Sequence, residues 1–105
     1  MKPTIHLEDD ELTSMVWKLS AKKNGVELIS FSSAKDLFKE IENFECDSDF
    51  YIDFDLAHDE INGVQVCEQL YERGFINLYL STGHDPKEFS KYEFIQNVIG
   101  KECPF

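Results

Sequence analysis

The sequence predicts an α/β protein built around one five-stranded parallel sheet. Five short apolar runs, each typical of a buried strand, alternate along the chain with segments whose apolar residues recur at helical spacing. Such alternation implies right-handed crossovers and helices on both faces of a parallel sheet. The 105 residues suffice for one hydrophobic core but not for two, so we expect a single domain over residues 1–105.

The strands are expected where apolar and β-branched residues run together between polar turns. They are the segments 4–7, 26–31, 50–54, 76–81 and 97–101. Between the last two strands, residues 85–95 are expected to hold at most a short and poorly patterned helix.

Three clearer helices are predicted from apolar residues at i, i+3, i+4 and i+7. The first ends near Gly25, and its apolar residues are Leu12, Met15, Val16 and Leu19. The second follows an N-cap at Ser32 or Ser33, and its stripe is Ala34, Leu37, Phe38 and Ile41. The third ends before Gly74 and carries Val66, Cys67, Leu70 and Tyr71. We expect Trp17, on the first helix, to be a partly exposed packing residue.

The composition favours a folded protein with basic or cationic partners. Hydrophobic residues make up 42% of the chain, well above the level typical of disorder. The net charge of −11 repels nucleic acid and anionic lipid, so we expect no direct binding to either. Cys46, Cys67 and Cys103 form no CxxC pair, and the sequence shows neither a signal-peptide core nor a membrane-length apolar run. These features predict a cytoplasmic protein with free thiols.

Polar residues follow four of the five expected strands. In an open parallel sheet the functional crevice lies at the carboxyl ends of the strands, so these residues are expected to meet at one edge. They are Glu8, Asp9 and Asp10 after the first strand, Asp55 at the end of the third, Ser81 and Thr82 after the fourth, and Lys101 after the fifth. Each alone is typical of a solvated turn, but together they indicate a site.

These residues resemble the receiver domains of two-component response regulators, through the motifs IHLEDDE, DLAHDEING, LSTGH and IGK. The resemblance covers nearly the whole chain and implies a flavodoxin-like sheet in the order 2-1-3-4-5. It also implies phosphoryl transfer from a phosphohistidine to an aspartate. The implied partner is a histidine kinase or a histidine phosphotransfer protein, and the implied chemistry is limited to autocatalytic phosphotransfer and autodephosphorylation. The ending GKECPF is similar to the short receivers that close hybrid histidine kinases.

Spacing chooses between the two aspartates of FYIDFD. Strand alternation places Asp53 and Asp55 on one side of the backbone, so the pattern alone leaves both open. Receivers typically have a glycine eight residues past the phosphoacceptor, and Gly63 is eight residues past Asp55. The resemblance therefore implies phosphorylation of Asp55 and leaves the role of Asp53 open.

The resemblance also implies a Mg²⁺ site around the phosphoacceptor. The family spacing from the second acid of the pair to the glycine after the first helix is sixteen residues, as from Asp9 to Gly25. This selects Glu8 and Asp9, with Asp10 as a neighbour or alternate. The implied ligands are Asp9, Asp55 and the Ala57 carbonyl, with Glu8 through water. A hard cation with oxygen ligands reduces the repulsion between a carboxylate nucleophile and a phosphoryl group.

Two further residues are expected to contact the phosphoryl group on the aspartate. Lys101 is expected to neutralise a phosphoryl oxygen, and Thr82 is expected to donate a hydrogen bond once the phosphoryl group arrives. Such a new bond turns a local charge into a conformational signal.

Several positions depart from the family pattern. Asp59 stands where receivers often have proline, and Glu102 replaces the proline that usually follows the lysine. Val98 occupies the place of the usual switch aromatic, so output is expected through another surface. His84 lies where the family tunes autodephosphorylation, although a solvated loop histidine fits equally well.

The end of the chain is the largest departure, because the fifth helix of receivers is missing or truncated. Without it, apolar sheet surface beside the first helix would be exposed, and such a patch usually marks an interface. We expect a homodimer, a cover supplied by a partner, or an ordered tail of residues 102–105 folded across the gap.

Two other functions fit parts of the sequence. A phosphorylation-independent pseudo-receiver would use the fold only for protein contacts. A haloacid-dehalogenase-type phosphatase would use Asp53 and Asp55 as its DxD pair, but that family has the pair after its first strand.

Overall fold

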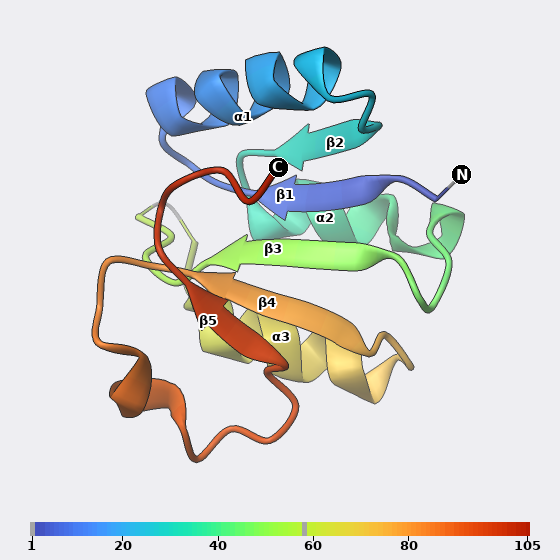
Figure 1. The fold of residues 1–105 in the computed structure, drawn as a ribbon. Coiled ribbons are helices and arrows are strands. Elements are labelled where there is room, and N and C mark those ends of the chain that lie inside the picture. The colour runs from blue at the N-terminus through green and yellow to red at the C-terminus, as the bar shows by residue number, and fades with distance from the viewer. Residues whose placement is uncertain (1, 58) are drawn as a thin grey trace.

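The computed structural model describes residues 2–57 and 59–105, and it has the expected architecture (Figure 1). The five strands are β1 (Thr4–Leu7), β2 (Leu28–Phe31), β3 (Asp49–Asp53), β4 (Asn77–Ser81) and β5 (Asn97–Ile99). All neighbouring strands pair in parallel, in the order β2-β1-β3-β4-β5. The predicted sheet and its order are confirmed.

Three α-helices connect these strands, at the places that the apolar spacing predicts. They are α1 (Glu11–Lys23), α2 (Ala34–Lys39) and α3 (Gly63–Glu72), and two short 3₁₀ segments, η1 (Ile41–Asn43) and η2 (Pro86–Phe89), follow α2 and β4. The weak pattern of residues 85–95 thus forms one 3₁₀ turn. Within the described residues, no helix has the length and apolar character needed to cross a membrane.

The two faces of the sheet are covered differently, with α2 and α3 on one side and α1 on the other (Figure 1). Alternate residues of the central strands form one buried cluster with α2 and α3, and its strand members are Ile5, Leu7, Phe50, Ile52, Leu78 and Leu80. No residue of α1 belongs to this cluster. The opposite row of side chains includes His6, Tyr51 and Tyr79, and Trp17 of α1 stacks on His6.

The apolar stripe that predicts α1 is not its buried face. Leu12, Met15, Val16 and Leu19 are between 51% and 68% exposed. The helix instead buries Ser14, Trp17 and Ala21, and Trp17 is fully buried. The expectation of a partly exposed Trp17 is therefore wrong, because its ring fills the space above His6 with a ring-centroid distance of 3.8 Å and an interplanar angle of 11°. Periodicity reports that a helix is amphipathic, but the shape of the surface beneath it decides which side docks.

Of the three covers expected for the sheet surface beside α1, the structure shows the ordered tail. After β5 the described chain forms no further helix and returns across the sheet to end beside β1 and α1 (Figure 1). The Ser20 hydroxyl donates a 2.9 Å hydrogen bond to the Phe105 carbonyl oxygen, and the Phe105 ring lies edge-on to Trp17 at a centroid distance of 5.9 Å.

Candidate functional site

Two buried carboxylates and one lysine meet at the carboxyl edge of the sheet. The Lys101 ammonium donates 2.7 Å hydrogen bonds to Glu8 Oε1 and to Asp53 Oδ1. The side chains of Glu8 and Asp53 are only 1% and 4% exposed, whereas that of Lys101 is 39% exposed. Because one ammonium serves two carboxylates, the group carries an excess of negative charge when all three are ionised.

Asp9 completes the acidic side of the site. Glu8, Asp9 and Asp53 each offer a carboxylate oxygen, and these oxygens all lie within 4.8 Å of one another. The Ala57 amide donates a 2.7 Å hydrogen bond to Asp9 Oδ2 and so positions that carboxylate. Clustered carboxylate oxygens are the donors that hard divalent cations prefer, so the residues present fit such an ion.

Burial and like charge shift the titration of Asp53. Removal from water, followed by the hydrogen bond and charge of Glu8, raises the pKa of Asp53 from 3.8 to about 7, although Lys101 acts in the opposite direction. Partial burial alone would lower the pKa of Lys101, but its bonds to Asp53 and Glu8 outweigh burial and raise it. An added cation would favour the ionised form of Asp53 for the same electrostatic reason.

Asp55 does not join this cluster. Its side chain is 71% exposed, and its Oδ2 lies 3.2 Å from His84 Nε2. Strand β3 ends at Asp53, whose last pairing is with Ser81 of β4, so the alternation assumed for Asp55 no longer applies. The Asp55 amide instead turns back to donate a 3.3 Å hydrogen bond to Asp53 Oδ1.

Gly63 lies against Asp53, although the glycine spacing typical of receivers selects Asp55. A Cβ at this position would lie 2.2 Å from the Asp53 carbonyl oxygen and 2.7 Å from the Phe54 Cα, so only glycine lets α3 begin here. The Gly63 amide also donates a 2.9 Å hydrogen bond to the Phe54 carbonyl. The glycine therefore packs against the end of β3 at Asp53, and the number of intervening loop residues is a poor guide to that contact.

The remaining predicted site residues have separate roles. Asp10 caps α1, because its Oδ2 accepts a 3.0 Å hydrogen bond from the Thr13 amide; hydrogen bonds from Thr13 lower the Asp10 pKa. Thr82 is buried at the edge of the site, and its hydroxyl oxygen accepts a 3.1 Å hydrogen bond from the His84 amide. The structure thus brings Glu8, Asp9 and Lys101 together, adds Asp53, and leaves Asp10 and Asp55 outside.

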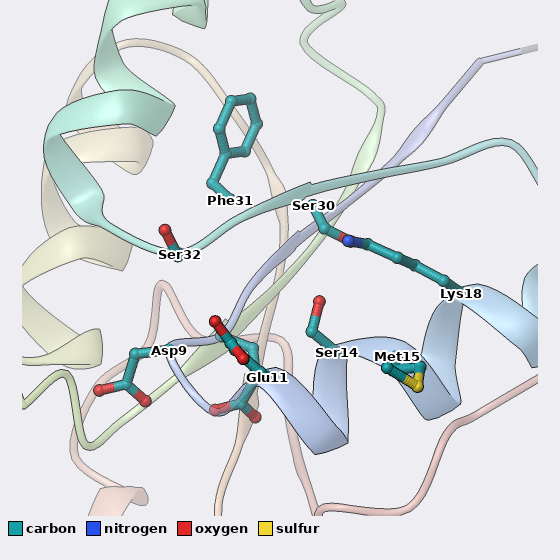
Figure 2. A pocket seen from close by; sticks show the side chains of 9 residues that line it. Asp9, Glu11, Ser14, Met15, Lys18, Ser30, Phe31 and Ser32 are labelled. Atoms are coloured by element: carbon teal, nitrogen blue, oxygen red, sulfur yellow. The ribbon is translucent and has the colours of Figure 1, made fainter.

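A cavity of about 440 Å³ adjoins the acidic cluster between α1 and β2 (Figure 2). Glu8 and Asp9 line the end nearest the cluster, and Ser14 and Lys18 of α1 line the side toward the helix. Two of the three acids of the cluster therefore border this cavity.

Solved structures match this fold, although no protein-family model and no curated protein matches the sequence. The response regulator TrrA of Thermotoga maritima, solved in complex with Mg²⁺-BeF, aligns with a TM-score of 0.79 over 100% of this chain and 90% of that chain, at 14% identity. A CheY-like receiver domain from Methanospirillum hungatei JF-1 aligns with a TM-score of 0.80 over 98% of this chain and 83% of that chain, at 18% identity.

The receiver domain of the TMAO respiratory response regulator TorR gives a TM-score of 0.76 over 97% of this chain and 86% of that chain, at 20% identity. The chain therefore has the fold of response regulator receiver domains, in agreement with the resemblance of its motifs.

Proposed function

We propose that this chain is a phosphoacceptor of two-component signalling that takes a phosphoryl group from a phosphohistidine onto Asp53. The supporting observation is the convergence of Asp53 with Glu8, Asp9 and Lys101. This assignment revises the Asp55 expected from glycine spacing, because the Asp55 carboxylate is exposed beside His84, whereas Asp53 binds Lys101 and belongs to the acidic cluster.

The proposed reaction follows from these groups. A carboxylate oxygen of Asp53 attacks the phosphorus, an oxygen–phosphorus bond forms, and the nitrogen–phosphorus bond breaks with its electron pair retained by the imidazole of the donor. We expect the Lys101 ammonium, which binds Asp53, to neutralise a phosphoryl oxygen there. Thr82 directly follows Ser81, the partner of Asp53 in the sheet, and its hydroxyl is expected to donate a hydrogen bond to the same group. The product is a covalent aspartyl phosphate, which water can hydrolyse.

Mg²⁺ is the proposed cofactor, and Glu8, Asp9 and Asp53 are the residues that would hold it. When bound, the cation would offset the repulsion between the acidic cluster and the incoming phosphoryl group. The excess negative charge of the cluster and the complex of TrrA with Mg²⁺-BeF both support this choice. The Asp55 carboxylate is left out of the revised ligand set because it lies outside the cluster. Ala57 is left out because its contact with the cluster is made by its amide, which donates to Asp9 and cannot ligate a cation.

The proposed partner is a cytoplasmic histidine kinase or histidine phosphotransfer protein, and α1 is the proposed docking face. Its exposed apolar residues Leu12, Met15, Val16 and Leu19 begin directly after the acidic pair. Lys18, Lys22 and Lys23 on the same helix add positive charge to a chain of net charge −11. A partner helix with apolar and acidic residues would fit this surface and bring its histidine to Asp53.

Phosphorylation by a small donor tests the assignment. Wild type, Asp53→Asn and Asp55→Asn are incubated with Mg²⁺ and acetyl phosphate, and intact mass is measured. Wild type and Asp55→Asn should gain one phosphoryl group, whereas Asp53→Asn should gain none. Loss only in Asp55→Asn would restore the assignment from glycine spacing. No modification of any chain would support the pseudo-receiver, and no observation favours the phosphatase.

A further inference from the structure

Lys101 connects the acidic site to the tail through two different parts of one residue. Its ammonium binds Glu8 and Asp53, each at 2.7 Å. Its backbone carbonyl oxygen accepts a 3.1 Å hydrogen bond from Trp17 Nε1 on α1. A change in the position of the ammonium can therefore reach Trp17 through one residue of chain.

Trp17 also contacts the tail itself, residues 102–105, which begins directly after Lys101. Phe105 meets the Trp17 ring edge-on, at an interplanar angle of 82°, and is anchored by the Ser20 hydroxyl. Beneath it, Trp17 stacks on His6 and lies edge-on to Tyr51 at a centroid distance of 5.6 Å. The tail thus closes one continuous column of aromatic rings that rises from the sheet.

Little else holds the tail in place. It contains no helix or strand, and its residues Glu102 and Pro104 are exposed. The column also encloses both ring nitrogens of His6, which have no hydrogen-bond partner among the described residues. Buried polar atoms without partners favour states in which water can enter. A short segment with few anchors over such a column is expected to open more readily than the rest of the fold.

We infer that the tail is a latch over Trp17 whose closure is coupled, through Lys101, to the phosphorylation of Asp53. The phosphorylation of Asp53 rests on the proposed function, whereas the contact of Lys101 with Trp17 does not. A phosphoryl group on Asp53 places new anionic oxygens beyond the carboxylate that Lys101 now binds, and so draws the ammonium outward. The Lys101 carbonyl then moves away from Trp17 Nε1, and the tail opens. The uncovered surface is formed by Trp17 and Tyr51, an aromatic surface for output that needs neither a fifth helix nor a switch aromatic.

Trp17 is the single tryptophan of the chain, so its emission reports directly on the latch. Wild type, Asp55→Asn and Asp53→Asn are mixed with Mg²⁺ and beryllofluoride, and bound fluoride is followed by ¹⁹F NMR. In wild type and Asp55→Asn we expect a red shift of Trp17 emission and faster amide hydrogen exchange at residues 102, 103 and 105. In Asp53→Asn we expect neither change. Bound beryllofluoride with unchanged emission and exchange would overturn the latch and leave the proposed function standing.

A second comparison tests the coupling without any phosphoryl analogue. Lys101→Met removes the ammonium but keeps the backbone carbonyl, and Lys87→Met is the matched control at an exposed lysine of η2. We expect altered Trp17 emission and tail exchange in Lys101→Met and not in Lys87→Met. Because loss of the ammonium leaves two buried acids together, the folding of each variant is checked by circular dichroism. Asp53→Asn, which keeps the ammonium but removes one partner of Lys101, is measured in parallel.

If Lys101→Met and Asp53→Asn both fold and show the same emission and tail exchange as Lys87→Met, Lys101 does not control the tail. This conclusion holds whether or not beryllofluoride changes the emission of wild type. If beryllofluoride fails to bind wild type but Lys101→Met or Asp53→Asn alters the tail, the proposed function fails and the coupling stands. The two proposals can therefore fail separately.

Discussion

The two faces of the sheet are built from alternate residues of the same strands, yet they differ in composition and cover. Against α2 and α3, the strands present Ile, Leu and Phe side chains that form one buried cluster. Against α1 and the tail they present His6, Tyr51 and Tyr79, and the cover includes one helix and the irregular tail. Asp53 continues the row of Tyr51 on this second face. The first face is therefore expected to supply most of the stability, and the second to carry the site and its response.

The largest effect is expected on the first face. Phe50 is fully buried and packs against Phe44 and Phe75. Phe50→Ala should lower the free energy of unfolding by about 3–5 kcal/mol, because truncation of a buried aromatic ring leaves a cavity. Urea unfolding measures the change. A loss below about 1 kcal/mol would mean that this face is not the main source of stability.

A smaller, pH-dependent effect is expected at His6, on the second face. Burial, together with the charges of Lys101 and Lys18, lowers the pKa of His6 from 6.5 to about 4. The unfolded chain thus takes up the proton more readily, so stability from this residue is present above pH 6.5 and is lost as the pH falls toward 4. His6→Phe removes this loss and should gain roughly 3 kcal/mol relative to wild type across that range.

The opposite contribution of Asp53 does not interfere with this comparison. Its pKa is raised from 3.8 to about 7, so its contribution to stability is lost as the pH rises through that interval. Because both chains contain Asp53, the difference between their urea-unfolding profiles isolates His6. A difference that stays constant between pH 7 and pH 4 would contradict the assigned His6 pKa.

The tail should contribute less than either buried residue. Phe105 is partly exposed and its ring contacts Trp17 edge-on. Phe105→Ala should cost about 1 kcal/mol of unfolding free energy, the order expected for one such aromatic pair. It should also shift Trp17 emission to the red in the unmodified protein. A cost as large as that of Phe50→Ala would mean that the tail belongs to the stable part of the fold.

The smallest effect on stability is expected on the outer face of α1. Leu19 is 64% exposed, so Leu19→Ser should change the free energy of unfolding by less than about 0.5 kcal/mol. If α1 is the docking face, transfer from a phosphohistidine partner should slow by about tenfold, while the reaction with acetyl phosphate is unchanged. Ile76→Ser, at an apolar residue that is 57% exposed just before β4, is the matched control. Equal transfer rates for the two variants would exclude this face.

Local patterns were sufficient for the elements and for most of the site. Apolar runs located the strands because each is short and the central strands β1, β3 and β4 are largely buried. Strand-end chemistry placed Glu8, Asp9 and Lys101 at one edge because parallel strands end together. The carboxylate inside β3 was the one sequence signal for Asp53, since a buried acid needs a partner. Glycine spacing selected Asp55, which lies outside the acidic cluster, because spacing counts loop residues, whereas Gly63 is required by a backbone contact with Asp53.

By itself, the sequence determined the alternation of strands and helices, the excess of acid and the residue types at the carboxyl edge, since these depend on neighbours in the chain. Only the tertiary structure decided that β3 stops at Asp53, because its pairing with β4 ends there. It also decided that Trp17 turns inward while the apolar stripe of α1 stays exposed, because the space above His6 fits one large ring. The closing of the tail on that ring depends on contacts between residues more than eighty positions apart, and no local pattern encodes them.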